Sequence, residues 1–195
     1  MTIKLRYGNT NTFLVAGPRG YLLVDTDYAG TLPAFYKALK ANGVQAKDIS
    51  FVLATHYHPD HMGLIPDLMK QGIKLLLMDT QTKDVHDSDQ IFAREKDLRF
   101  IPVDESNAEV VSCPESRDFL ARIGIAGEII STPSHSRDSV SLILDDGDCL
   151  VGDLEPQEYL SAYRENPALK KDWDAIRGFR PKRILYSHVN EKMIR

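Results

Sequence analysis

The order of apolar and polar residues divides the chain into short strands and helices from one end to the other. The β-rich apolar runs 11–16 and 21–25 are joined at 17–20 by Gly-Pro-Arg-Gly, which predicts a β-hairpin. Apolar residues at helical spacing predict a helix over 31–42, with Gly43 as its C-cap. The chain therefore opens with strands and continues into a helix.

The middle of the chain repeats this alternation and then becomes polar. Apolar runs at 49–54 and 73–78 predict buried strands, and the segment 60–71 between them predicts one helix that ends at Gly72. Residues 80–98 are polar and charged, with weak helical periodicity, so we expect them to lie on the surface or to cover a site. The wider segment 79–112 is either one wall of a binding pocket or a plain surface excursion.

The last third of the chain returns to strands and adds two helices. Its pattern predicts helices at 114–123 and 168–179, and strands at 128–132, 139–144, 149–152 and 183–186. Strands and helices thus alternate in two halves that each open with strands, which predicts an α/β protein with helices outside layered sheets. No repeat or Gly/Ser-rich linker separates the halves, so we expect residues 1–195 to form a single domain.

Composition narrows the class of protein without naming a reaction. With 195 residues, 43% of them hydrophobic and 27% charged, the chain can bury one sizeable core. A formal net charge of −4 provides no overall basic surface for nucleic acid, and no apolar run approaches the roughly 20 residues that span a bilayer. The N-terminus lacks a signal-peptide core, and Cys113 and Cys149 lack the spacing of a disulfide framework. We therefore expect a cytoplasmic protein with reduced thiols, and with neither nucleic acid nor membrane as a partner.

One segment, Thr-His-Tyr-His-Pro-Asp-His-Met-Gly at 55–63, carries the most specific chemical signal. In extended backbone, positions two apart point the same way, so His56 and His58 can bind one ion. Asp60 and His61 fall at the start of the predicted helix, where the helix dipole favours a carboxylate. Imidazole nitrogens and carboxylate oxygens are ligands that zinc accepts.

Three further candidate ligands each follow a predicted strand, where loops present reactive groups on a rigid scaffold. They are His135, Asp153 and His188. Five of the six histidines then belong to one candidate site, and clustered histidine and aspartate at ligand spacing indicates a metal centre. The sixth, His86, lies among acidic and polar residues, which favours a solvated helix.

On these motifs the sequence resembles the metallo-β-lactamase superfamily. The resemblance covers most of the chain, from the strand that ends at 22–26 to His188. The resemblance implies an αββα sandwich, with two mixed β-sheets flanked by helices and the site at one edge of the sheets. It also implies two metal ions, zinc before iron or manganese, with one bridging aspartate and one supporting aspartate behind the ligands. By this match the first metal is held by His56, His58 and His135, the second by Asp60, His61 and His188, the bridge is Asp153, and the support is Asp25.

The sequence departs from the family pattern at informative positions. Ser134 replaces a glycine, and Arg137-Asp138 replaces Pro-Gly, in the loop of the third ligand. Classical zinc β-lactamases commonly carry cysteine at the position of Asp153, so antibiotic hydrolysis is a poor first expectation. Related di-iron oxidoreductases carry glutamate at the position of His58, which favours zinc hydrolysis over reduction of oxygen or nitric oxide.

The expected activity is that of a metal-dependent hydrolase in which two metal ions hold a bridging hydroxide. Asp60 would orient the hydroxide and pass a proton to the leaving group. Only seven residues follow His188, and the chain has no exosite arm or inserted domain, so we expect neither a glyoxalase II-like C-terminal domain nor nucleic-acid processing. A small ester, lactone or thioester is the expected substrate.

Other functions remain open on the sequence alone. A non-haem iron enzyme of the same fold, such as a sulfur dioxygenase or an oxygen-reducing protein, is one, and a phosphodiesterase is another. A non-catalytic metal-binding sensor or a scaffold with one closed metal site would use the same ligands. Tyr57 and Tyr159 are candidates for substrate contact, although packing explains either residue as well. The oligomeric state is open, with a homodimer among the alternatives.

Overall fold

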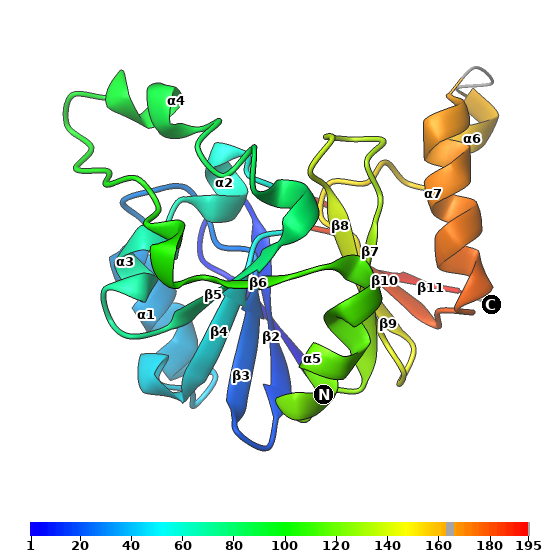
Figure 1. The fold of residues 1–195 in the computed structure, drawn as a ribbon, viewed down its shortest axis with the longest axis horizontal. Coiled ribbons are helices and arrows are strands. Elements are labelled where there is room, and N and C mark those ends of the chain that lie inside the picture. The colour runs from blue at the N-terminus through cyan, green and yellow to red at the C-terminus, as the bar shows by residue number, and fades with distance from the viewer. Residues whose placement is uncertain (163–165, 195) are drawn as a thin grey trace.

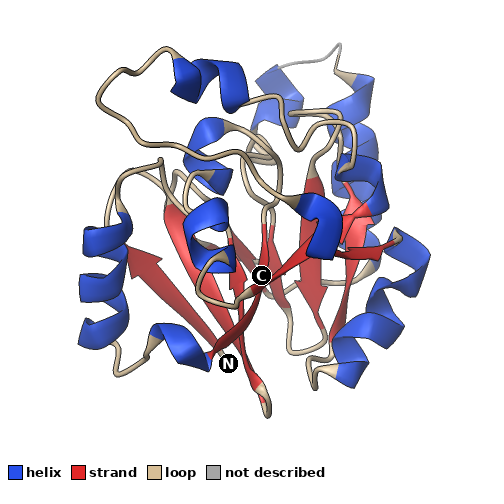
Figure 2. Cartoon of the chain, turned by 60° about the vertical axis from the view of Figure 1, so that its left-hand side comes forward, coloured by secondary structure: helices blue, strands red, loops and turns tan. Residues whose placement is uncertain are grey.

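Two β-sheets form the centre of the molecule, and helices lie outside them (Figure 1). The structure is a computed structural model and describes residues 1–162 and 166–194. Helices α1 (Leu32–Ala41) and α3 (Ile65–Met69) lie beside one sheet, and α7 (Pro167–Gly178) lies beside the other (Figures 1 and 2). The predicted αββα sandwich of two mixed sheets is therefore confirmed.

The first sheet has six strands in the order in which they occur along the chain. Its first three strands pair antiparallel, and the third to the sixth pair parallel. Because parallel strands run in one direction, their C-terminal ends meet at one edge of the sheet. The strands are β1 (Thr2–Arg6), β2 (Asn11–Gly17), β3 (Gly20–Val24), β4 (Ile49–Leu53), β5 (Lys74–Met78) and β6 (Glu109–Val111).

The second sheet has five strands in the order β11-β10-β9-β8-β7. Only β9 and β10 pair parallel, and the other neighbours are antiparallel. The strands are β7 (Gly127–Ser131), β8 (Val140–Leu144), β9 (Asp148–Leu150), β10 (Arg183–Leu185) and β11 (Lys192–Met193). The remaining helices are α2 (Pro59–Met62), α4 (Asp89–Ala93), α5 (Ser116–Arg122) and α6 (Tyr159–Ala162).

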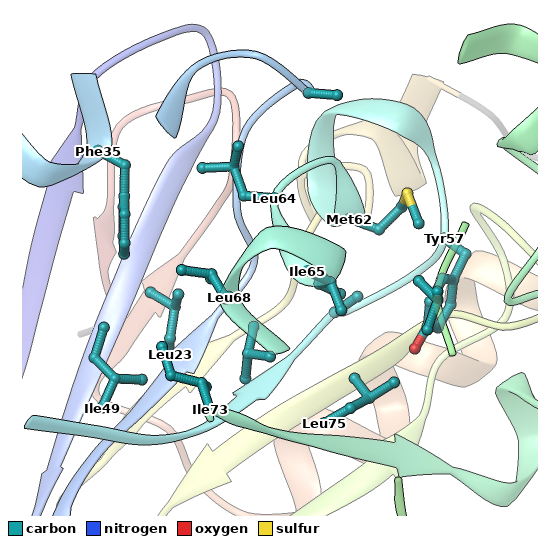
Figure 3. Packing of buried hydrophobic residues seen from close by; sticks show 14 of the residues in the cluster. Leu23, Phe35, Ile49, Tyr57, Met62, Leu64, Ile65, Leu68, Ile73 and Leu75 are labelled. Atoms are coloured by element: carbon teal, nitrogen blue, oxygen red, sulfur yellow. The ribbon is translucent and has the colours of Figure 1, made fainter. Parts of the chain in front are cut away.

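Both faces of the first sheet are buried, which explains its nearly continuous apolar strands. Along β3, Leu22 and Val24 pack between the two sheets, whereas Leu23 points to the opposite face, as the two-residue period of a strand requires. There Leu23 joins Phe35 of α1 and Leu68 of α3 (Figure 3). A third cluster packs α7 against the second sheet.

The prediction of one helix over 60–71 is wrong, because the chain forms two short helices, α2 and α3, in its place. Leu64 donates its backbone N–H to Thr26 Oγ1 (3.2 Å) instead of to a helical carbonyl. Pro66 has no N–H to donate. The hydrogen bonds that would join the two helical segments are therefore missing. The chain changes direction between α2, which carries candidate ligands, and α3, which packs in the core.

The sequence pattern did not predict three of the strands: β1, β6 and β11. Within the segment 79–112, expected to be a pocket wall or a surface excursion, the structure thus adds β6 at the edge of the first sheet. All three are edge strands with at most one buried residue each, so they lack the apolar run that marks a buried strand. Cys113 and Cys149 are free thiols, as predicted.

Candidate metal centre

Loops that follow four strands, β4, β7, β9 and β10, converge at one edge of the sandwich. Their side chains make polar contacts with one another although they come from distant parts of the sequence. The structure thereby gathers all seven predicted ligands: His56, His58, Asp60, His61, His135, Asp153 and His188.

The first group of candidate ligands consists of His56, His58 and His135. His56 Nε2 lies 3.0 Å from His58 Nδ1, and His135 Nε2 lies 3.3 Å from the same atom. His56 is buried, whereas the other two rings reach solvent. Three imidazole nitrogens that face one point match the ligand set of a zinc ion.

The second group consists of Asp60, His61 and His188. Asp60 Oδ2 lies 3.1 Å from His188 Nε2, and Asp60 Oδ1 lies 3.9 Å from His61 Nε2. Pro59 begins α2, and Asp60 follows in its first turn. The local sequence thus turns the chain after His58 and directs the next ligands to a separate group.

Asp153 lies between the two groups. Its Oδ2 atom is 3.3 Å from His61 Nε2, 3.7 Å from His135 Nε2 and 3.9 Å from His56 Nε2. Its Oδ1 atom is 3.2 Å from His188 Nε2. This carboxylate is therefore in reach of ligands from both groups, as a bridging ligand must be.

Unpartnered buried atoms test whether cations fit here. His61 Nε2 and Asp153 Oδ1 are buried and have no hydrogen-bond partner of acceptable geometry among the described residues. Leaving such groups unpaired costs about 1–3 kcal/mol each, and a bound cation would satisfy both. The donor set of imidazoles and carboxylates suits zinc and also suits iron or manganese, so the residues fit the group that the sequence implies.

Asp25 holds the second group from behind. Its buried carboxylate accepts hydrogen bonds from Thr55 N (2.6 Å), Thr55 Oγ1 (2.9 Å) and Ser187 Oγ (3.0 Å), and lies 3.0 Å from His61 Nδ1. The backbone of Asp25 has φ 59°, a left-handed conformation that costs energy in a residue with a side chain. When Asp25 accepts a hydrogen bond from Nδ1 of His61, Nε2 is the ring nitrogen that faces the site. Partners behind a metal ligand select its tautomer in this way.

The carboxylates control the charges on the histidines of the second group. Burial lowers the pKa of His61, but Asp25 and Asp153 outweigh it and raise this pKa to about 10. The adjacent carboxylates of Asp153 and Asp60 raise the pKa of His188 to about 10. In the first group, burial and the neighbouring His61 hold the pKa of His56 well below its ordinary value. Without metal, His61 and His188 therefore hold protons at neutral pH, whereas His56 does not.

Gln81 is a site residue that the sequence analysis missed. Its fully buried amide donates to the carbonyl oxygens of Ala54 (3.0 Å), Thr55 (3.3 Å) and Asp138 (3.1 Å), and accepts from Met78 N (3.2 Å). It joins the backbone just before His56 to the loop that carries His135. One glutamine in a polar segment provides no sequence signal for this role.

The departures at 137–138 form contacts of their own. Asp138 Oδ2 accepts the backbone N–H of Tyr57 (2.7 Å), and so links the loops of the first group directly. Arg137 pairs with Asp84 and, at 3.1 Å, with Asp87. These contacts fasten the start of the 79–112 segment to the third-ligand loop.

The third departure, Ser134, is held from the other side of the site. Its backbone N–H donates to Asp172 Oδ2 (2.8 Å), a buried carboxylate on α7. No sequence pattern indicated that α7 contacts this loop, because 38 residues separate the two positions.

Of the two explanations given for Tyr57, substrate contact or packing, its position in the structure favours packing. Its side chain is 1% exposed and packs in the core beside Leu75 (Figure 3). Tyr159 begins α6 and is 45% exposed, so its role in substrate contact stays a prediction. His86 is exposed, as predicted, and forms ion pairs with Asp89 and Glu105.

Comparison with known proteins agrees with this fold. Residues 5–188 match the metallo-beta-lactamase superfamily. Among solved structures, the native FEZ-1 metallo-beta-lactamase from Legionella gormanii is 19% identical, with a TM-score of 0.68 over 96% of this chain and 76% of that chain. A metallo-beta-lactamase family protein from Thermus thermophilus is 20% identical, with a TM-score of 0.65 over 98% of this chain and 74% of that chain.

Curated relatives are similar over parts of their length. Lactamase-like protein adaB of Aspergillus niger is 39% identical over 74 residues, which are 37% of this chain and 22% of that protein. Lactamase-like protein nscB of Trichophyton rubrum is 28% identical over 72% of this chain and 36% of its own length. The beta-lactamase-like protein 2 homolog of Drosophila melanogaster is 26% identical over 93% of this chain and 59% of its own length. The chain thus spans less than two thirds of each of these relatives.

The fold, the ligand motif and the family match support one conclusion: this chain belongs to the metallo-β-lactamase superfamily. It has a histidine and aspartate cluster with the composition of a metal-binding site. Among the residues that the structure describes, no helix is long and apolar enough to cross a membrane.

Proposed function

We propose that this chain is a hydrolase that binds two metal ions, zinc first, and cleaves a small carboxylic ester, lactone or thioester. The observation that carries the proposal is the position of Asp153, which lies within 3.9 Å of nitrogen atoms from both ligand groups. A carboxylate shared in this way suits two adjacent cations. When bound, such cations lower the pKa of water to near 7 and stabilise negative charge as the substrate carbonyl is attacked.

Each of the two ligand groups would hold one cation. The three imidazoles of the first group would hold one ion, and Asp60, His61 and His188 the other. Asp25 would keep His61 in the tautomer that presents Nε2, as its contact with Nδ1 supports. The first group consists of three imidazoles, whereas the second includes the carboxylate of Asp60, so the two positions differ in charge.

Asp60 is the residue that we propose moves a proton. Its carboxylate is half-buried beside His188, and the bonds and charges of His188 and His61 hold its pKa low against the opposing effect of burial. It is therefore ionised at neutral pH and available to accept a proton. We infer that it orients the attacking water and passes a proton to the leaving group.

The choice of substrate rests on chemistry more than on relatives. Asp153 takes the position where classical zinc β-lactamases commonly carry cysteine, which supports an ester-type bond over a β-lactam. A formal charge of −4 also favours a small-molecule substrate over nucleic acid. The single domain over 1–195, a cytoplasmic location and an open oligomeric state, with a homodimer among the alternatives, belong to the same proposal.

A hydrolysis panel on metal-replete protein tests the proposal. The panel contains esters, lactones, thioesters, β-lactams and bis-nitrophenyl phosphate, each with a chelator control and with zinc added back. We expect turnover of at least one ester-type class, its loss with chelator, and its return with zinc. Asp60→Ala should lower kcat by a factor of about 10² or more because general acid–base catalysis contributes that much.

Two results would overturn the proposal. One is the absence of hydrolysis across the panel with a full metal complement. The other is protein made in medium balanced for zinc and iron that takes up iron and shows redox turnover, which would indicate an iron enzyme of the same fold.

A further inference from the structure

A second cavity lies at the edge of the first sheet opposite the candidate metal centre. It has a volume of about 460 Å³ and is lined by residues at the starts of β3, β5 and β6 and at the end of α5. The candidate ligands His56 and His58 follow the other end of β4. Because β3 to β6 are parallel, the cavity and the metal centre lie at opposite ends of the same strands. A volume of this size is within the range of small-molecule sites.

The floor of the cavity is aromatic and aliphatic. Phe51 of β4 and Phe119 of α5 meet edge to face, with ring centroids 5.3 Å apart. Phe119 and Ile125 are buried, and Phe51 is half-buried. An apolar body placed here would remove the exposed part of the Phe51 ring from water, which is worth roughly 25 cal/mol per Å².

The rim of the cavity carries an excess of positive charge. Arg19, Lys74 and Arg122 line it together with one carboxylate, Glu109, and all four side chains are exposed. The side chains of Arg19 and Lys74 form no ion pair or hydrogen bond within the described residues, and the Arg122 guanidinium lies 5.3 Å from the centre of the Phe119 ring. Two positive charges are therefore left uncompensated on a chain whose net charge is −4.

Another cation of the same helix shows the contrast. Arg117 of α5 lies outside the cavity and pairs with Glu128 at 2.9 Å and Asp145 at 3.0 Å. Arg19 and Lys74 at the cavity rim have no such ion pair among the described residues, so they remain available to a ligand.

We propose that this cavity binds a small organic anion that has one carboxylate and an aromatic or aliphatic body. The carboxylate would lie among the three rim cations, where a guanidinium can donate two parallel hydrogen bonds. The body would lie on Phe51 and Phe119. This site is separate from the metal centre and does not depend on the proposed hydrolase activity.

The test uses 4-phenylbutyrate as the probe and full-length, metal-replete protein. Two-dimensional amide NMR should show shifts at 19–22, 50–51 and 123–125, with the same dissociation constant when a chelator is present. The uncharged amide of the probe should bind about tenfold more weakly, because it lacks the charge that the rim attracts. Inorganic phosphate alone should bind more weakly than the probe, because it has no apolar body.

Charge reversal supplies the matched variants. Arg122→Glu and Lys74→Glu should each weaken binding of the probe about tenfold, whereas Lys171→Glu, at an exposed position of α7, should leave it unchanged. Thermal unfolding would verify that all three variants fold. The proposal is overturned if the shifts lie around His56, if the amide binds as tightly as the acid, or if Lys171→Glu weakens binding as much as the rim variants.

Discussion

The two groups of candidate ligands are held in place by different kinds of structure. The second group rests on one buried carboxylate, Asp25, which bonds three elements that meet behind His61. The first group is held by several separate contacts: the Gln81 amide, the buried Asp138 carboxylate and the exposed Arg137 pairs. One site can thus combine support by a single buried carboxylate with support that is spread over several residues and reaches a surface segment.

The strongest effect should follow a change where the two groups meet. Asp153→Ala removes the carboxylate that lies between ligands of both groups, so we expect loss of both metals and a fall in kcat/KM of about 10³ or more. Metal content after gel filtration and the rate of the best panel substrate measure this. Asp174→Ala, on the exposed face of α7, is the control. If the variant retained both metals in full, Asp153 would not be a bridging ligand and that part of the proposal would be wrong.

The protonation difference between the groups predicts a strong pH dependence. Because the pKa values of His61 and His188 are raised to about 10, both rings are protonated in the metal-free protein at pH 7.5. A cation must displace these protons, so affinity in the second group should rise as pH increases towards 10, by up to about 100-fold per pH unit when two protons leave. The first group should vary much less.

Calorimetry in two buffers of different ionisation enthalpy measures this proton release. One binding event should release protons, and the other should release few. Equal release in both events would contradict the assigned difference between the groups.

Asp25→Ala should affect the second group more than the first. It leaves buried His61, Thr55 and Ser187 without their common partner, so we expect a loss of about 3 kcal/mol in the free energy of unfolding. Affinity for the second metal should fall by about 10–100-fold, measured by competition with a chelating dye. Asp25→Asn should recover part of the stability because the amide oxygen still accepts hydrogen bonds. If the affinity for both metals fell equally, Asp25 would support the fold as a whole and not the second group in particular.

Gln81→Leu should produce the reverse selectivity. Three backbone carbonyls lose a donor, so we expect a loss of about 1–3 kcal/mol in stability and weaker binding in the first group, by about tenfold. Gln71→Leu is the matched control, because Gln71 bonds Tyr36 and Asp67 at the surface. Cobalt titration followed by visible absorption can separate the two sites, and unchanged first-group affinity would contradict the role given to Gln81.

Arg137→Ala should have the weakest effect. The arginine side chain is 71% exposed, so its pairs with Asp84 and Asp87 should contribute little to stability and weaken with salt. We expect a change of a few-fold or less in first-group affinity. A change as large as that of Gln81→Leu would show that the surface pairs, and not the buried amide, hold this loop.

Local sequence patterns were enough to establish the chemistry and most of the elements. The spacing of His56, His58, Asp60 and His61 follows from strand and helix geometry, which is local, and it located the site before any coordinates. Buried strands such as β3 and β4 could also be predicted from the sequence, because a strand that is buried on both faces has a continuous apolar run.

What holds those ligands, and what lies near them, became known only from the folded chain. Gln81, Asp138 and Asp172 bond to backbone groups that are distant in sequence, and such contacts leave no periodic pattern. The break between α2 and α3 and the burial of Tyr57 have the same cause, because both depend on which segments pack together. Local spacing specifies which groups can bind a cation, whereas chain packing determines their distances, protonation and support.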